Sequence, residues 1–155
     1  MSNADVINRM DDVIQNIYYN TMIDGMSKIG MNAVNNAVAN HEFNNDTNNL
    51  EDSYGYAIYY NGDLKQKFLF NPNASVLKDG KSGHEEAEKF FNDFSAGSGY
   101  TLIVVAAMYY AAYVEFEHGL DVLTNTYQKS KTEGEKVFRS VASYYNYKSA
   151  KWVQM

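Results

Sequence analysis

The N-terminal part of the chain carries a helical pattern longer than a domain of this size is wide. Between Asp5 and about Asn40 no proline intervenes, and apolar residues recur at intervals that are mostly three or four. At 1.5 Å per residue, this predicts an amphipathic helix of roughly 50 Å. Its apolar positions are Val6, Met10, Val13, Ile17, Ile23, Met26, Ile29, Ala33 and Ala37. Such a helix extends beyond a 155-residue domain unless something else covers its stripe, and a neighbouring subunit is one candidate.

Two glycines interrupt this pattern. Gly25 and Gly30 each cost a helix interior about 1 kcal/mol relative to alanine. We therefore expect either a bend or a close helix contact at these positions.

A β-hairpin is predicted from two β-prone runs, 54–60 and 64–70, which flank Asn61-Gly62-Asp63. A type I′ turn needs positive φ at both central residues, and Asn-Gly meets that need best. Asn71-Pro72 ends the second strand. The preceding segment, 41–53, is polar and rich in Asn and Asp, which predicts a loop or a frayed short helix.

The second half of the chain predicts a short helix, an extended region and another long helix. Residues 84–94 form the short helix, with acidic residues early as the helix dipole prefers. Residues 100–108 read as a buried strand, and we expect 109–116 to continue extended. A long helix is expected from Leu123 to about Tyr145, and its candidate inward positions are Leu123, Tyr127, Val137, Phe138 and Val141.

The predicted fold class is therefore α+β. Its order is a long N-terminal helix, a small antiparallel sheet with a hairpin, a short helix, a strand pair and a long C-terminal helix, rather than a βαβ series. Residues 1–155 are expected to form a single domain. Residues 142–155 alternate aromatic and lysine residues, and we expect this tail to fold against a partner.

Composition narrows the classes of function. The chain has no cysteine, which removes disulfides, thiolate metal sites and cysteine nucleophiles and fits a reducing cytosol. Its net charge is −6 and its basic residues are scattered, which argues against a phosphate-binding surface. No apolar run approaches the roughly 20 residues that span a bilayer, so we expect no membrane partner. The 14 tyrosines exceed what a small domain buries easily, so part of this set is expected at protein contacts.

No pattern of catalytic or metal-binding residues emerges. The three histidines, His41, His84 and His118, each have acidic neighbours, but none forms a His-x-x-x-His or Glu-x-x-His pair on one predicted helix face. Glu115 and His118 fall in the segment expected to be extended, where they would point to opposite faces. We therefore predict no metal, no cofactor and no catalytic residue.

Two alternatives stay open at this stage. An acidic chain offers many carboxylate pairs of the kind that hydrolyse glycosides, although no peptidoglycan-hydrolase pattern surrounds them here. The aromatic series Tyr54, Tyr56, Tyr59 and Tyr60 has the π-faces that stack on nucleobases, but no Lys or Arg is interleaved with it. A sheet face or an interface is the favoured interpretation of these tyrosines.

Two segments together resemble the tail-completion, or head–tail joining, proteins of tailed bacteriophages. Members often show D/R-T-G-x-L-x-x-S before a hairpin, and later a strand ending in Y-A-x-Y-V/L-E-F/x-G ahead of a C-terminal helix. The first signature is matched by Asp46, Thr47, Leu50 and Ser53. The second is matched by Tyr110, Ala111, Tyr113, Val114, Glu115, Phe116 and Gly119. Asn48 replaces the usual Gly and accepts positive φ, while Glu117 and His118 lengthen the second motif.

The resemblance covers roughly residues 5–141, in the family's order, and implies a non-enzymatic virion protein. Such a protein is made in the bacterial cytoplasm and forms a ring of identical copies at the head–tail junction. A portal or adaptor protein lies above the ring and a tail protein below it, and DNA passes through the lumen without specific binding. The alternatives are a tail terminator, another minor phage structural protein, or a small enzyme or binding module.

The resemblance also implies structural roles for the motif residues. Ser53 or Thr47 would cap a turn, and Tyr110 and Tyr113 would pack the hairpin against a helix. If Tyr113 and Phe116 are core rings, their replacement by alanine should cost about 3–5 kcal/mol.

Overall fold

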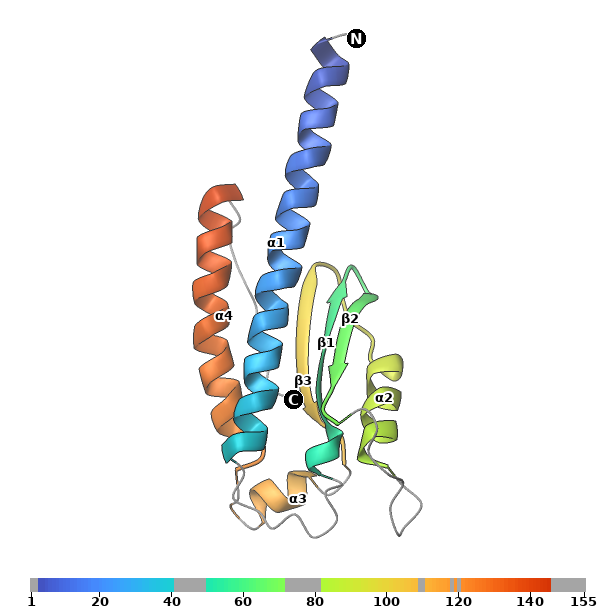
Figure 1. The fold of residues 1–155 in the computed structure, drawn as a ribbon, viewed down its shortest axis with the longest axis vertical. Helices are drawn as coiled ribbons and strands as arrows, with labels where there is room; N and C mark the ends of the chain where they lie inside the picture. The colour runs from blue at the N-terminus through green and yellow to red at the C-terminus, as the bar shows by residue number, and fades with distance from the viewer. Residues whose placement is uncertain are drawn as a thin grey trace.

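A three-stranded sheet lies between helices in the computed structural model of this chain (Figure 1). The structure describes residues 3–40, 50–71, 82–108, 111–117, 119 and 121–145; for Tyr113 and residues 142–145 only the backbone is described. Helix α1 (Asn3–Asn40) packs on one face of the sheet and α2 (Gly83–Asp93) on the other, and α4 (Thr124–Tyr145) runs antiparallel along α1. The predicted α+β fold, with its two long helices, small antiparallel sheet and short helix, is confirmed.

The central strand of the sheet is β1 (Tyr54–Tyr60), which pairs antiparallel with both β2 (Asp63–Leu69) and β3 (Tyr100–Ala106). Asn61 has φ +53° and Gly62 has φ +90°, so both central turn residues adopt the positive φ that was predicted. The register shifts between Ile58 and Tyr59, which marks a β-bulge in the hairpin.

Both faces of β1 are buried, because alternate residues point to opposite faces of a sheet. Tyr54, Tyr56 and Ile58 join the cluster under α1, whereas Ala57 and Tyr59 join the cluster under α2. The phenols find partners inside: the Tyr56 hydroxyl lies 2.9 Å from Ser27 Oγ, and the Tyr59 hydroxyl donates to the Phe91 carbonyl at 2.7 Å. Buried rings cannot stack on nucleobases, so that alternative is wrong for Tyr54, Tyr56 and Tyr59, whereas Tyr60 is only half-buried.

The two glycines of α1 are sites of close approach. A Cβ at Gly30 would lie 2.5 Å from the Tyr56 ring, and a Cβ at Gly25 would lie 2.7 Å from Val137 Cγ1 on α4. Glycine therefore lets α1 approach both the sheet and α4 more closely than any other residue would. The expected close helix contact is therefore found at Gly25, whereas Gly30 makes its close contact with the sheet instead.

Helix α1 has an exposed half and a packed half. Residues 3–17 are all exposed, whereas Tyr18, Met22 and Ile29 are buried. Tyrosine rings mark the boundary, with centroid distances of 5.9 Å for Tyr18–Tyr100 and 5.2 Å for Tyr19–Tyr60. Beyond this boundary the N-terminal half projects away from the other helices and the sheet (Figure 1).

One predicted element was wrong. Residues 109–116 were expected to be extended, but β3 ends at Ala106 and the chain forms helix α3 (Ala111–Phe116). A hydrogen bond from the Ala111 N–H to the Met108 carbonyl, 2.9 Å, holds the start of α3 close to the chain that follows β3. Two consecutive alanines at the start of this helix favour a helical conformation.

Helix α4 agrees with its predicted bounds and with most of its predicted inward face. Val141 is buried, and Val137 and Phe138 are partly buried in the same cluster. Thr126 is also buried, although it was not predicted to be. The expected folding of the tail falls largely on residues 146–155, outside the described part of the chain. None of the helices in that part is long and apolar enough to cross a membrane.

Candidate functional site

The motif residues that the structure describes gather at one end of the sheet, where η1 (Glu51–Ser53), the end of β3, α3 and the start of α4 lie (Figure 1). Leu50 is 3% exposed and Ser53 is fully buried. Asp46, Thr47 and Tyr110 lie outside the described residues, as does the Tyr113 side chain, so the roles predicted for them stay predictions. We call the described part of this end of the molecule the motif junction.

Ser53 ties the start of β1 to the end of β3. Its hydroxyl donates to the Leu50 carbonyl at 2.7 Å and accepts from the Met108 N–H at 3.4 Å. Its carbonyl accepts from the Ala107 N–H at 3.3 Å. The first of these bonds closes the turn before β1, as expected for Ser53. The other two connect the first signature to the chain that leads into the second.

Glu115 holds the beginning of α4 from a different helix. Its carboxylate accepts hydrogen bonds from the Thr124 N–H at 2.9 Å and from the Leu123 N–H at 3.4 Å. The first N–H groups of a helix lack partners within the helix, and a negative charge there is favoured by the helix dipole. Asp121 adds a second acceptor for this turn by bonding the Asn125 N–H at 3.1 Å.

Tyr54 joins the same junction from the sheet. Its hydroxyl donates to the Val122 carbonyl at 3.2 Å, just before α4. Burial raises the pKa of Tyr54 far above its usual range, and the nearby carboxylates Asp121, Glu115 and Glu51 raise it further. The phenol therefore stays protonated and remains a hydrogen-bond donor at any physiological pH.

The last two motif residues lie on the surface. Phe116 is 76% exposed, so its ring does not meet the condition, a place in the core, under which its replacement was expected to cost several kcal/mol. The ring sits at the last position of the six-residue helix α3, where no described element covers it. Gly119 has φ +66°, a conformation that side chains disfavour, so glycine suits the loop that leads towards α4.

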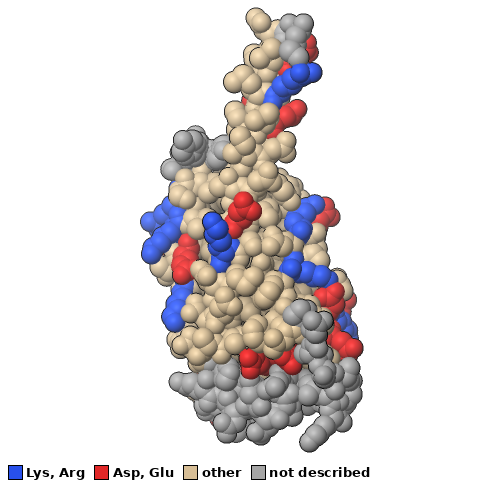
Figure 2. Space-filling model, in the orientation of Figure 1, with Lys and Arg blue, Asp and Glu red and all other residues tan. Residues whose placement is uncertain are grey.

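A second candidate surface is the exposed half of α1. Its apolar side chains are 43–59% exposed, and we call this set the α1 stripe: Val6, Ile7, Met10, Val13, Ile14 and Ile17. Figure 2 shows this projecting segment as largely uncharged surface with a few charged side chains along it. Exposed apolar residues that recur with helical spacing mark interaction sites more often than isolated ones do.

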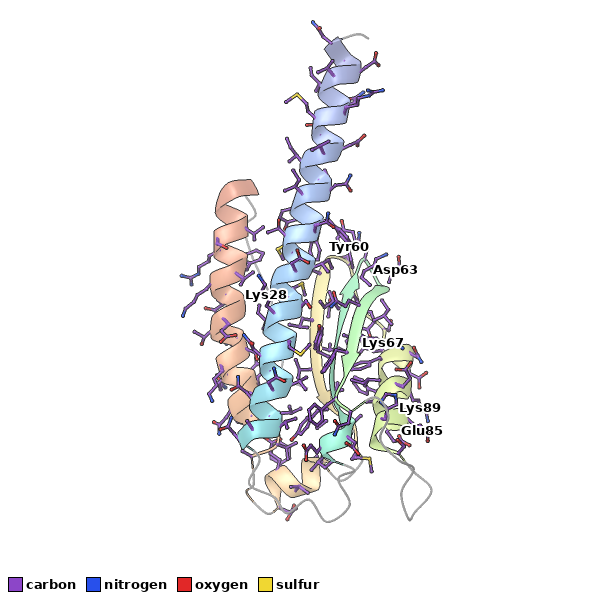
Figure 3. The ribbon with its side chains drawn as sticks, viewed as in Figure 1. Lys28, Tyr60, Asp63, Lys67, Glu85 and Lys89 are labelled. Atoms are coloured by element: carbon purple, nitrogen blue, oxygen red, sulfur yellow. The ribbon has the colours of Figure 1, made fainter. Side chains whose placement is uncertain are left out.

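The His, Asp and Glu side chains do not form a candidate metal site within the described ranges. No three His, Asp or Glu side chains there are close enough to hold a metal ion. His84 lies in the first turn of α2, while His41 and His118 fall outside the description. The charged side chains of β2 have structural partners: Lys67, labelled in Figure 3, forms an ion pair with Glu88 of α2.

Two features of these surfaces were missed by the sequence analysis. Ile7 and Ile14 belong to the α1 stripe, and their seven-residue spacing on a helix could have revealed them. The capping role of Glu115 had no local signal, because its partners are eight and nine residues away in a separate helix. Comparisons of the chain with protein-family models, with curated proteins and with solved structures give no match.

Proposed function

We propose that this chain is a non-enzymatic structural subunit of a tailed-bacteriophage particle. In this proposal, identical copies form a ring at the head–tail junction. The ring joins the portal or its adaptor to the tail and leaves a channel through which DNA passes.

The observation that carries the proposal is the convergence of the two signatures on the motif junction. Ser53, from the first signature, bonds the chain that leaves β3, and Glu115, from the second, caps α4. Each side chain satisfies backbone groups of another segment. Residues used in this way build a scaffold rather than a reactive centre. The resemblance implied that role for the motif residues, and the arrangement supports it.

The surfaces of the molecule also favour assembly. Both outer strands, β2 and β3, have one edge without a partner strand in the described sheet. Exposed edges invite pairing with another chain, and a head-to-tail contact that closes on itself generates a ring. The α1 stripe adds apolar contact area beyond what the core of one copy uses. These features supply the two kinds of surface that a ring subunit needs.

The charge of the chain suits a channel wall that does not hold DNA. A net charge of −6 gives a surface that repels phosphate on average. Counterion release, which drives most non-specific DNA binding, needs clustered Lys and Arg. We therefore expect no measurable affinity for duplex DNA at physiological salt, in keeping with passage through a lumen without binding.

Purified particles provide the test. Mass spectrometry of intact virions should find the chain in several copies, and averaged images of particles lacking it should lose density between head and tail. Glu115→Ala should impair this incorporation, whereas Glu117→Ala, at an exposed neighbouring acid without a described partner, should not. Density lost at the far end of the neck, where the tail begins, would instead indicate a tail terminator. A chain that is missing from virions and stays monomeric beside its portal would contradict the proposal.

A further inference from the structure

The α1 stripe has a shape that can be read from helix geometry. At about 100° per residue, its six positions span roughly 120° of the helix surface. Met10 and Ile17 occupy the middle of the stripe. One edge is formed by Ile7 and Ile14, and the other edge by Val6 and Val13. A two-stranded coiled coil uses a narrower seam, whereas a stripe this wide is typical of a helix that faces the core of a bundle.

The two flanks of the stripe carry opposite charges. On the same helical wheel, Asp11 lies about 50° beyond the Ile7 and Ile14 edge, and Arg9 lies about 50° beyond the opposite edge. The two residues are only two positions apart, so they lie at nearly the same height along the helix. The remaining face is polar and carries Asp5, Asn8, Asp12 and Asn16, of which Asn16 lies nearest to Arg9.

We infer that the exposed half of α1 packs side by side and in parallel with the same segment of further copies of this chain. Each helix then lies between two neighbours. In a parallel, cyclic arrangement, one flank of each helix meets the opposite flank of the next. This places Asp11 of one copy beside Arg9 of another at each contact, and an ion pair at such flanks sets partner choice and orientation.

An antiparallel pair lacks this complementarity. Two-fold symmetry across antiparallel helices brings each flank against its own equivalent, so Asp11 would face acidic surface and Arg9 basic surface. Like charges opposite one another are destabilising. The charge pattern therefore selects the parallel arrangement.

The size of the segment explains why more than two copies are needed. Residues 3–17 form a rod of about 22 Å. One helix–helix contact of that length buries less than the roughly 1,000 Å² that a stable interface requires. Two contacts per helix raise the buried area, and contacts between the bodies of the subunits add to it. The stripe then strengthens a larger assembly rather than forming a dimer alone.

Light scattering of the full chain tests the association itself. We expect a mass above that of the monomer, lost in Ile14→Asp and retained in Asn8→Asp, which places the same charge opposite the stripe. Arg9→Glu and Asp11→Lys should each reduce the associated fraction about tenfold, and the double variant should restore it. A monomeric wild-type chain, or a stripe covered within a monomer, would overturn the inference.

Crosslinking tests the relative orientation of the α1 helices in different copies. Because the chain has no natural cysteine, only the introduced cysteines react. With a short bis-maleimide, Val6→Cys chains should crosslink to each other, whereas Asn8→Cys chains should not. Efficient crosslinking of Val6→Cys chains to Ile17→Cys chains, without Val6–Val6 products, would show antiparallel packing and overturn the inference.

The inference rests on the self-association in the proposed function, but the two can fail separately. If Ile14→Asp still assembles and enters particles normally, the stripe is not the contact and the ring proposal stands. If the stripe drives association but the chain is never found in virions, the proposed function fails and the stripe contact stands.

Discussion

The two halves of α1 belong to one helix, yet their apolar faces lie on nearly opposite sides of it and have opposite surroundings. In the C-terminal half, Ile29 is 4% exposed and Val34 is fully buried. In the N-terminal half, Ile7 and Met10 are each 59% exposed. The sheet and α4 cover the first half, and no described part of the chain covers the second.

This difference teaches that an amphipathic pattern specifies a face and does not specify what covers it. Burial of a large apolar side chain stabilises a fold by about 1.5–3 kcal/mol, and the packed half obtains this within one copy. The exposed half obtains it only when another molecule supplies the partner. The stabilisation that comes from the exposed half should therefore depend on protein concentration, whereas the stabilisation from the packed half should not.

The largest expected effect comes from one substitution made in each half. Ile29→Ala should lower the free energy of unfolding by about 2–5 kcal/mol, because it leaves a cavity in the core. Ile14→Ala, on the exposed stripe, should change it by less than about 0.5 kcal/mol in dilute solution. Chemical denaturation of the monomer measures both. Equal costs would mean that the stripe is already buried in the monomer.

Gly30→Ala should lower the free energy of unfolding by less than Ile29→Ala does, although replacing a helical glycine by alanine usually raises it. Alanine normally stabilises a helix relative to glycine by about 1 kcal/mol. Here the new Cβ would lie 2.5 Å from the buried Tyr56 ring, so the variant should lose about 1–3 kcal/mol through overpacking. Gly97→Ala is the control, since nothing lies within 4 Å of its Cβ position. The melting temperatures of the two variants would show whether α1 can move away from the sheet to make room for a Cβ at Gly30.

Much of the fold followed from local signals in the sequence. Asn61-Gly62 predicted the hairpin, because few residues accept positive φ twice in succession. The periodicity of the two segments predicted the long helices α1 and α4. Helix α3 was missed because Tyr109–Phe116 mixes β-prone tyrosines with helix-forming alanines, and tertiary context decided the outcome.

The motif junction was less predictable than the fold. The resemblance implied that Ser53 or Thr47 caps a turn, and Ser53 does bond the backbone near its own position, as serine often does. Its second bond, to the Met108 N–H, joins residues 55 apart in the sequence, and no local pattern encodes such a contact. The position of Phe116 was also not predictable, because a large aromatic ring is usually buried and this one is exposed.

The cap of α4 gives the next smaller effect and tests how far the packed half of α1 depends on that helix. Glu115→Ala removes both acceptors at the start of α4 and should cost about 0.5–2 kcal/mol, as the loss of a helix cap does. Hydrogen exchange should rise in α4 and in Tyr18–Met26 of α1, where the two helices pack. Glu117→Ala is the matched control and should leave exchange unchanged. A rise confined to α3 would show that the cap acts only locally.

Phe116→Ala should have the smallest effect on folding. With its ring 76% exposed, the free energy of unfolding should change by less than about 0.5 kcal/mol. Phe91→Ala, at a ring that is 1% exposed under the sheet, should cost about 3–5 kcal/mol in the same assay. Phe116 thus belongs with the α1 stripe, as apolar surface that one copy leaves uncovered. A cost for Phe116→Ala that grows with protein concentration would place this ring in a contact between copies, whereas a cost of the Phe91 size in dilute solution would place it in the core.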